Sequence, residues 1–259
     1  TSAWGFWSEM QKYEPTDAAI RFRGLNLGRQ NDGSVLINSM YIFDFYHLDH
    51  NKRQDAIERG KTELDYLIPF MQETIPGFRN AEISFVAEEL YIRETRHMES
   101  LYRLTIDDVL EHRNFWDKIA LGSYPVDIQD ISLDQRGYIV GVPAMYSIPF
   151  RCLVPAETDG ILVVGRSAGY DSLAHGSTRV IPVGMATGEA AGAAVYLRNE
   201  RYRGASWQDL AQNEEFIAEL QTVLKNQGAY LPDFHIPHPL EGHWAYPAVR
   251  KIRSLGMVS

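Results

Sequence analysis

The chain has 259 residues, enough for one large domain or two small ones, and its 45% hydrophobic and 23% charged content is that of an ordinary globular protein. The formal net charge of −9 disfavours nucleic acid as a partner, because its phosphates would be repelled, and no stretch is long and apolar enough to span a bilayer. The single cysteine, Cys152, excludes an internal disulfide and a cysteine-based metal cluster, and we expect it to be a buried apolar residue.

Strand and helix patterns alternate in the first 150 residues. Strands are expected over residues 34–38, 40–45, 83–88 and 89–95. Apolar residues recur at helical spacing over residues 52–75, and Pro76 and Gly77 end that pattern. Thr105, followed three residues later by Asp108, predicts that a short helix starts there.

The most informative segment covers residues 158–194. The apolar, β-branched run 161–165 ends in glycine, which is typical of a buried parallel strand that leads into a tight turn. Pro182 suits the first turn of a following helix, where its missing N–H costs nothing. Three glycines would then lie on one helix face: Gly184, Gly188 and Gly192. The pattern favours a nucleotide-cofactor fold with the helix N-terminus near an electron-rich group; the alternative is a helix packed tightly on a sheet.

This segment resembles the C-terminal signature of the FAD-dependent oxidoreductases related to glutathione reductase. Residues 158–165 resemble the late FAD motif of that superfamily, which has a threonine, a short spacer, an apolar strand and a glycine. An aspartate that contacts the ribityl chain usually follows, whereas Arg166 stands here, as in the subfamily described simply as FAD-dependent oxidoreductase. Segments 91–96 and 146–155 resemble the same subfamily, and the resemblance covers residues 20–200.

The element pattern predicts an α+β fold with part of an α/β layer. The resemblance implies the C-terminal part of a two-domain flavoprotein, with a mixed-sheet substrate domain plus the closing strand and glycine-rich helix of the FAD domain. It assigns residues 1–150 to the substrate or capping domain and 151–200 to the closing elements of the FAD domain. A C-terminal helix capped by Ser206 is expected within residues 201–231.

One expected motif does not occur. In this superfamily the ADP half of FAD lies on a G-x-G-x-x-G turn, and no such turn is present in the sequence. The chain also opens without an initiator methionine. We therefore expect half of the FAD cradle to lie outside this sequence, and the chain alone to bind FAD weakly or not at all.

The resemblance implies two groups of site residues. The cofactor would be contacted by Gly165, Arg166, Ser167 and the backbone N–H groups of Val183, Gly184 and Met185. His175 and Arg179 lie in the turn expected before the glycine-rich helix. His175 could move a proton while hydride passes to or from the flavin, and Arg179 could clamp a substrate carboxylate. The alternatives are a histidine bonded to a loop carbonyl and an arginine that satisfies a helix end.

Two other polar clusters are candidates for a site. Arg93, Glu94, Arg96 and His97 would form an ion-paired strand more readily than a substrate anion site. The second cluster consists of Asp44, His47, Asp49 and His50. These are better interpreted as surface polar residues at a strand end than as a metal site, so no metal is expected.

The tail carries a separate signal. Residues 243–256 resemble the opening of an S-layer homology module, after prolines that predict a linker within 232–259: Pro232, Pro237 and Pro239. The alternative is one more amphipathic helix of the main fold. The module would imply docking on bacterial cell-wall polysaccharide, and therefore export to the cell surface.

The sequence leads to one main hypothesis and two others. The main hypothesis is an FAD-dependent oxidoreductase that transfers hydride between flavin and a small organic substrate. The second is a non-catalytic cell-surface scaffold anchored through the tail. The third is a carbohydrate-active protein, whose 5 Trp and 14 Tyr residues would stack on sugar rings.

Overall fold

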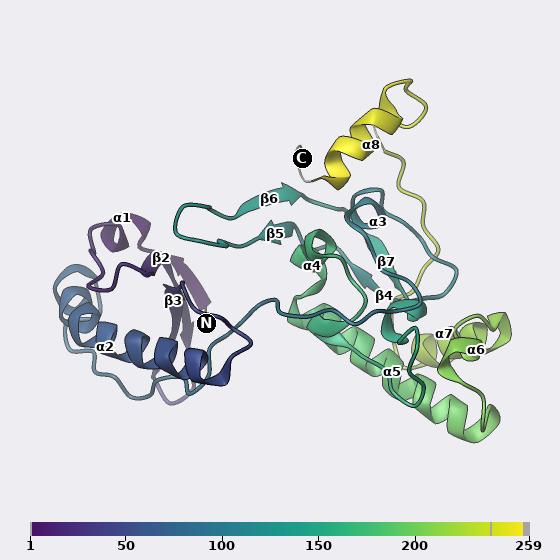
Figure 1. Cartoon of the computed structure of the whole chain (residues 1–259), viewed down its shortest axis with the longest axis horizontal. Helices are drawn as coiled ribbons and strands as arrows, with labels where there is room; N and C mark the ends of the chain where they lie inside the picture. The colour runs from purple at the N-terminus through teal and green to yellow at the C-terminus, as the bar shows by residue number, and fades with distance from the viewer. Residues whose placement is uncertain (1, 239, 256–259) are drawn as a thin grey trace. The chain divides into compact units, whose positions relative to one another are not determined.

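The computed structural model of the chain, which describes residues 2–238 and 240–255, divides into two compact units (Figure 1). Unit 1 comprises Thr1–Ile92 and Asp130–Arg136, and unit 2 comprises Arg93–Gln129 and Gly137–Ser259. The chain therefore passes from one unit to the other three times.

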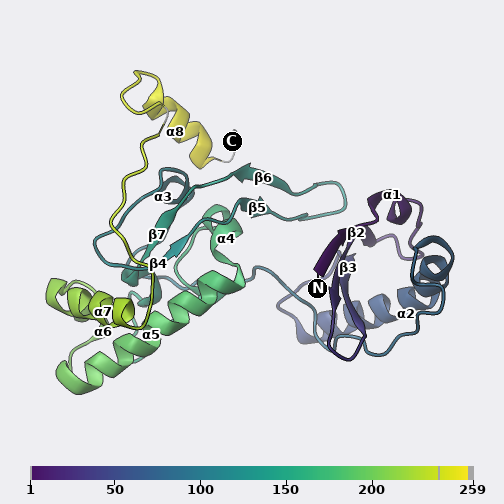
Figure 2. The ribbon, with the colours of Figure 1, turned by 180° about the vertical axis from the view of Figure 1, so that it is seen from behind.

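Unit 1 is a small antiparallel sheet with one long helix. Its elements are β1 (Ser2–Gly5), α1 (Trp7–Met10), β2 (Ile20–Arg29), β3 (Val35–Ile42) and α2 (His50–Thr74). The strand order is β1-β2-β3, and α2 packs on β3 at Gly60, where an added Cβ would lie 2.8 Å from Cδ1 of Ile42 (Figure 2). Asp49 caps α2 by accepting hydrogen bonds from the N–H groups of Asn51 and Lys52.

The long helix is confirmed, but the strands of this region differ from the sequence-based prediction. The two short strands expected at 34–38 and 40–45 are one strand, β3. Residues 83–95 form no strand, although two were expected. Strand-forming side chains need a neighbouring strand to complete the ladder, and this segment instead makes isolated bonds such as that from the N–H of Ile92 to the carbonyl of Leu90.

Unit 2 holds the remaining elements, and its sheets are also antiparallel. They are α3 (Ile106–Leu110), β4 (Lys118–Gly122), β5 (Val126–Ile128), β6 (Tyr138–Gly141), β7 (Tyr146–Pro149), η1 (Phe150–Leu153), η2 (Gly165–Ser167), α4 (Ser172–Thr178), α5 (Ile181–Arg201), α6 (Trp207–Leu210), α7 (Glu214–Asn226) and α8 (Tyr246–Ser254). Strand β4 pairs with β7, and β5 pairs with β6.

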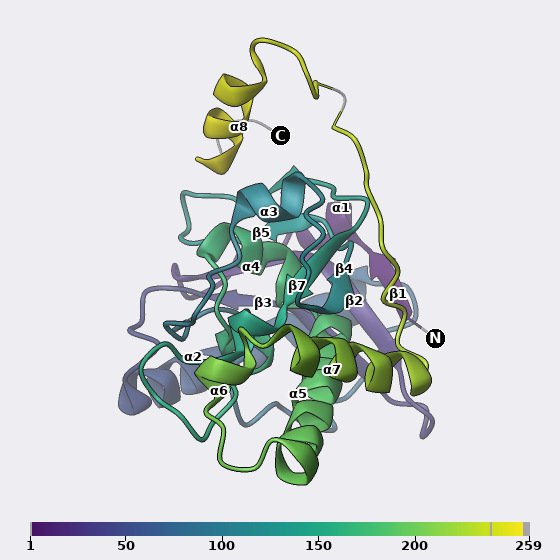
Figure 3. The ribbon, with the colours of Figure 1, turned by 90° about the vertical axis from the view of Figure 1, so that its right-hand side faces the viewer.

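One hydrophobic core joins the elements of unit 2. Helix α7 lies across α5, and β4 contacts both helices (Figure 3). Fully buried side chains from these elements, from β7 and from η1 meet there, including Ile148, Phe150, Ala190, Ala194, Phe216 and Leu220. Because this core draws on both sides of residue 150, the compact units differ from the expected division into residues 1–150 and 151–200, which stays a prediction about function.

The expected strand at 161–165 is not formed, which corrects the sequence-based prediction. Residues 161–164 lie outside every strand, with Ile161 and Val164 exposed. The N–H of Val163 donates to the carbonyl of Leu153 at 2.9 Å, but a central strand needs a partner along both edges. The fold is thus a mixed α and β fold with small antiparallel sheets, and the only parallel pairing among the described residues is an isolated bridge between Leu104 and Tyr170.

Local signals in the sequence correspond to observed elements. Thr105 and Asp108 form a capping box at α3, and Pro182 lies in the first turn of α5. Ser206 caps a helix as predicted, but Asn213 caps a second helix. The expected final helix is therefore divided into α6 and α7. Cys152 is fully buried as predicted, and burial raises the pKa of its thiol.

No single described helix is long and apolar enough to cross a membrane. The pair α4 and α5 reaches that threshold only when taken together, across a bend of 91°. The buried face of this pair packs within the core of unit 2.

Candidate functional site

The corner between α4 and α5 carries most of the predicted site residues. Asp171 caps α4 by accepting from the N–H of Ala174 at 2.6 Å, and it also accepts from the N–H of Ile106, the first residue of α3, at 3.0 Å. One carboxylate therefore fixes the starts of two helices. Burial, the largest influence on this carboxyl, raises the pKa of Asp171.

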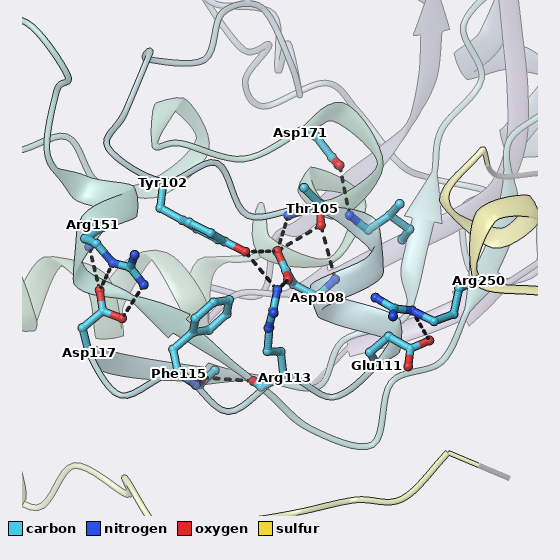
Figure 4. Close-up of polar contacts among 12 residues, drawn as sticks. Tyr102, Thr105, Asp108, Glu111, Arg113, Phe115, Asp117, Arg151, Asp171 and Arg250 are labelled. Atoms are coloured by element: carbon cyan, nitrogen blue, oxygen red, sulfur yellow. Dashed lines mark hydrogen bonds and ion pairs between the residues drawn. The ribbon is translucent and has the colours of Figure 1, made fainter. Parts of the chain in front are cut away.

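A network on the other side of α3 stabilises the same region (Figure 4). Asp108 accepts from the hydroxyl of Tyr102 at 2.9 Å and pairs with Arg113 at 2.6 Å. Asp117, which is fully buried, receives two hydrogen bonds from the guanidinium of Arg151, at 2.8 and 3.1 Å. Such a bidentate pair holds both partners in a fixed orientation, and Asp108 connects the start of α3 to Tyr102 and Arg113.

His175 lies inside helix α4, not in a turn as predicted, and it is only 2% exposed. Its Nε2 lies 3.0 Å from the carbonyl oxygen of Arg93. A carbonyl can only accept, so Nε2 carries the hydrogen and Nδ1 is the unprotonated nitrogen of the neutral ring. Burial lowers the pKa of His175 and outweighs the opposing effects of Arg93 and Glu94. Among the described residues, Nδ1 has no hydrogen-bond partner.

Glu94 and His97 lie next to His175, and sequence reasoning did not place them there. Nε2 of His97 lies 2.8 Å from Oε1 of Glu94, and the hydroxyl of Ser172 donates to the same oxygen at 2.6 Å. Burial raises the pKa of Glu94, but the bonds from His97 and Ser172 outweigh it, so the pKa lies below its ordinary value. The rings of His97 and His175 meet edge to face, with centroids 4.8 Å apart.

Arg179 follows α4 and already has an anionic partner. Its Nη2 lies 2.8 Å from Oδ2 of Asp127, which belongs to β5, and the side chain is 10% exposed. A substrate carboxylate would have to compete with Asp127 for this guanidinium. The partner is a carboxylate of a strand and not a helix end, so the contact differs from both roles expected for Arg179 from the sequence.

The glycine turn and the start of α5 lie close together. Gly165 has φ of +68°, a conformation that favours glycine because a side chain would be strained there. A Cβ added to Gly184 would lie 3.9 Å from Cα of Gly165. Residues expected to be brought together by a cofactor motif, 165–167 and 183–185, are thus neighbours.

The cofactor contacts expected for the N–H groups of Val183, Gly184 and Met185 stay a prediction, but two of these N–H groups have partners within α5. The N–H of Gly184 donates to the carbonyl of Val180 at 3.1 Å, so it is used inside the helix. Met185 follows in the same i→i−4 pattern. The first-turn N–H groups that precede this pattern belong to Ile181 and Val183, because Pro182 has none.

One side of α5 is exposed to solvent at several positions. We call it the open face of α5, defined by Ile181, Met185, Gly188 and Gly192. Ile181 is 77% exposed and Met185 is 70% exposed. A Cβ added at Gly188 or Gly192 would meet nothing within 4 Å. An apolar surface beside the first-turn N–H groups of a helix suits a planar apolar ring with an electron-rich edge.

The other predicted site residues have simpler environments. Arg166 and Ser167 are exposed within η2, and the carbonyl of Ser167 accepts from the N–H of Met98 at 2.9 Å. Within residues 2–238 and 240–255, no three His, Cys, Asp or Glu side chains come together as a metal site requires.

Comparison with known proteins gives one match. The sequence model of the family described as FAD dependent oxidoreductase matches residues 2–224. No curated protein and no solved structure matches the chain.

Proposed function

The chain belongs to the FAD-dependent oxidoreductase family, and on that premise we propose that it takes part in hydride transfer between FAD and a small organic substrate. The observation that carries the proposal is the junction of Gly165 with the start of α5. There a glycine turn, first-turn N–H groups and an open apolar helix face adjoin one another.

The residues present fit the flavin part of FAD. The positive φ of Gly165 keeps a side chain away from the turn, and Gly184 keeps the helix close to it. The N–H groups of Ile181 and Val183 carry the partial positive charge of the helix N-terminus. Ile181 and Met185 offer the apolar surface that a planar ring would cover.

Bound FAD would supply the hydride acceptor or donor. The chain's own contribution would be electrostatic, because the start of α5 stabilises negative charge that develops on a neighbouring group. His175 would handle the proton, since its ring is neutral and Nδ1 can accept. Arg179 would contact a substrate anion only if that anion displaced the carboxylate of Asp127. We therefore give Arg179 a role in binding that is secondary to the proton-transfer role of His175.

The proposal is tested by the visible absorption spectrum of the full-length natural protein, recorded after gel filtration has removed unbound flavin. Met185→Glu places a negative charge on the open face of α5, where it would repel the electron-rich edge of flavin. We expect this variant to lose FAD or to hold it with a lower midpoint potential. Tyr196→Glu is the matched control, because Tyr196 is also exposed on α5 but lies three turns further along.

The flavin bands of the wild type and of the two variants either support or contradict the proposed site. Retained flavin bands that weaken in Met185→Glu but not in Tyr196→Glu would support the site. A protein without flavin bands, or equal effects of the two variants, would overturn it. No observation supports the alternatives of a non-catalytic scaffold or a carbohydrate-active protein.

Docking of the tail on cell-wall polysaccharide, and export, remain predictions. Helix α8 is an element that both interpretations of the tail share. Arg250 lies 3.7 Å from Glu111, next to α3, which favours the alternative of a helix belonging to the main fold. Binding of the purified protein to isolated cell walls, compared with a chain ended at residue 231, tests the docking.

A further inference from the structure

Strand β3 of unit 1 is an outer strand with one edge open to a partner. The sheet order is β1-β2-β3, so among the described residues β3 pairs with β2 alone (Figure 2). The second edge of such a strand presents a row of backbone N–H and C=O groups. These groups hydrogen-bond best to another extended chain, which makes a β-strand the kind of partner that fits here.

The first half of β3 is exposed on both faces. Val35 is 44% exposed, Leu36 is 62% exposed and Ile37 is 37% exposed, and Asn38 is exposed as well. Successive side chains of a strand point to opposite faces, so both faces of the sheet are open at this end. Leu36 lies opposite Gly28 of β2, which has no side chain to cover it. A strand beside β3 would supply the cross-strand contact that Leu36 does not receive from β2.

The second half of β3 is covered. Ser39 is buried, and Met40 lies against α2, where a Cβ added to Gly60 would be 3.3 Å from Sδ of Met40. The exposed part of the strand is therefore residues 35–38, which we call the free edge of β3. These four residues pair with β2 in a regular register, so the free edge is straight enough to accept a further strand.

The free edge lacks the features that usually prevent strand addition. Natural outer strands are often short, or they carry a lysine, another charge or a proline. Strand β3 has 8 residues, and its sequence VLINSMYI contains no charged residue and no proline. By contrast, β1, the other outer strand of the sheet, is only 4 residues long. Of the two outer strands, β3 is therefore the one suited to pairing.

The absence of charge also indicates which strand would pair with β3. When a strand pairs with its own copy about a two-fold axis, residues near the axis lie opposite themselves or a close neighbour. A charged residue there would face a like charge, which is destabilising. The chain has a net charge of −9, which opposes the approach of two copies, but residues 35–38 are uncharged.

We propose that β3 pairs antiparallel with β3 of a second copy of this chain, through the free edge, so that the two sheets of unit 1 join into one continuous sheet. The inference concerns unit 1 alone and does not depend on flavin. A strand from a different protein would leave the purified protein monomeric, so the molar mass in solution separates these two occupants.

The test is light scattering during gel filtration of the full-length natural protein at several concentrations. We expect a dimer that dissociates on dilution. Leu36→Lys should abolish the dimer, because the ammonium groups of the two copies would lie near the two-fold axis. Phe85→Lys is the matched control and should leave the dimer unchanged, since Phe85 is 71% exposed in unit 1 but lies outside every strand. A monomer at every concentration, or equal loss of the dimer in both variants, would overturn the proposal.

A second measurement locates the contact and does not rely on a lysine variant. Single cysteines are placed in turn at positions 35–38, and the protein is oxidised. Cys152 is fully buried and should add little background. In antiparallel pairing only residues near the axis meet their own copies, so a disulfide-linked dimer at one or two of the positions would support the proposal. Cross-linking at none of them, or at all four as parallel pairing would give, would overturn it.

Discussion

Gly165 is the residue whose backbone conformation matters most at the proposed site. Its φ of +68° is rarely adopted by residues with a side chain. We predict that Gly165→Ala lowers the free energy of unfolding by about 1 to 2 kcal/mol. Urea denaturation measures the change.

The control for this prediction is Gly188→Ala, which should have the opposite sign. Gly188 lies within α5, and a Cβ there meets nothing within 4 Å. Alanine is a better helix former than glycine by about 1 kcal/mol, so this variant should be more stable. If both substitutions change stability equally, the strain assigned to Gly165 is absent.

His175 makes a pH-dependent contribution to stability. Burial lowers its pKa in the folded state, so as pH falls the unfolded chain takes up this proton first. The contribution is fully present above the unfolded pKa of about 6.5 and is lost as pH falls from there toward the folded value. His175→Gln should be less stable at neutral pH but should lose less stability over that acidic interval. Thermal melts at several pH values measure this, and His50→Gln, at an exposed position, is the control for the substitution itself and should change stability little.

At the scale of elements, Glu63 connects α2 to the segment before β2. The side chain is buried and accepts hydrogen bonds from the hydroxyl of Tyr13, from the N–H and hydroxyl of Thr16, and from the N–H of Asp17. Burial raises the pKa of Glu63, but these bonds outweigh it and the pKa is lowered. The contact between α2 and the segment before β2 therefore depends on the carboxylate of Glu63.

We predict that Glu63→Ala lowers the stability of unit 1 by about 3 kcal/mol, because two backbone N–H groups lose their acceptor in a buried place. Hydrogen exchange of amides in α2 and β2 measures the loss. Glu58→Ala removes an exposed carboxylate from the same helix and should cost less than about 0.5 kcal/mol. A similar cost for both variants would contradict the assigned role of Glu63.

The elements that could be predicted from the sequence are those whose start, end or buried face is determined by residues close to one another in the chain. The capping box of Thr105 and Asp108, the place of Pro182 and the apolar stripe of α2 depend on residues a few positions apart. Strands at 83–95 and 161–165 could not be assigned correctly, because a strand depends on a partner that no local pattern reveals. His175 was found through its motif, whereas Glu94 and His97 come from an irregular segment about 80 residues earlier that only the folded chain brings near it.

At the scale of the whole molecule, residues 161–164 lie outside every strand, although the resemblance assigns a strand of the FAD domain to them. Ile161 and Val164 are exposed, and the sequence contains no G-x-G-x-x-G turn for the ADP half of FAD. We predict that residues 1–259 alone bind FAD weakly or not at all. Titration of the chain with FAD, followed by flavin fluorescence, measures the affinity. A stable complex with one FAD per chain would refute this prediction.

The connectivity of the two units has a consequence for limited proteolysis. Residues 130–136, the tip between β5 and β6, belong to unit 1, where Asp130 pairs with Arg21 and Arg23, while both strands belong to unit 2. A protease that cuts only near residue 92 would therefore separate residues 1–92 covalently from the rest, while residues 130–136 stay attached to unit 2 and keep the ion pairs of Asp130 with Arg21 and Arg23. Separate fragments under denaturing conditions would show the cut, but release of an intact unit would require three cuts. Under native conditions a protein cut once near residue 92 should therefore still elute as one species, because residues 130–136 hold the two fragments together without a covalent bond.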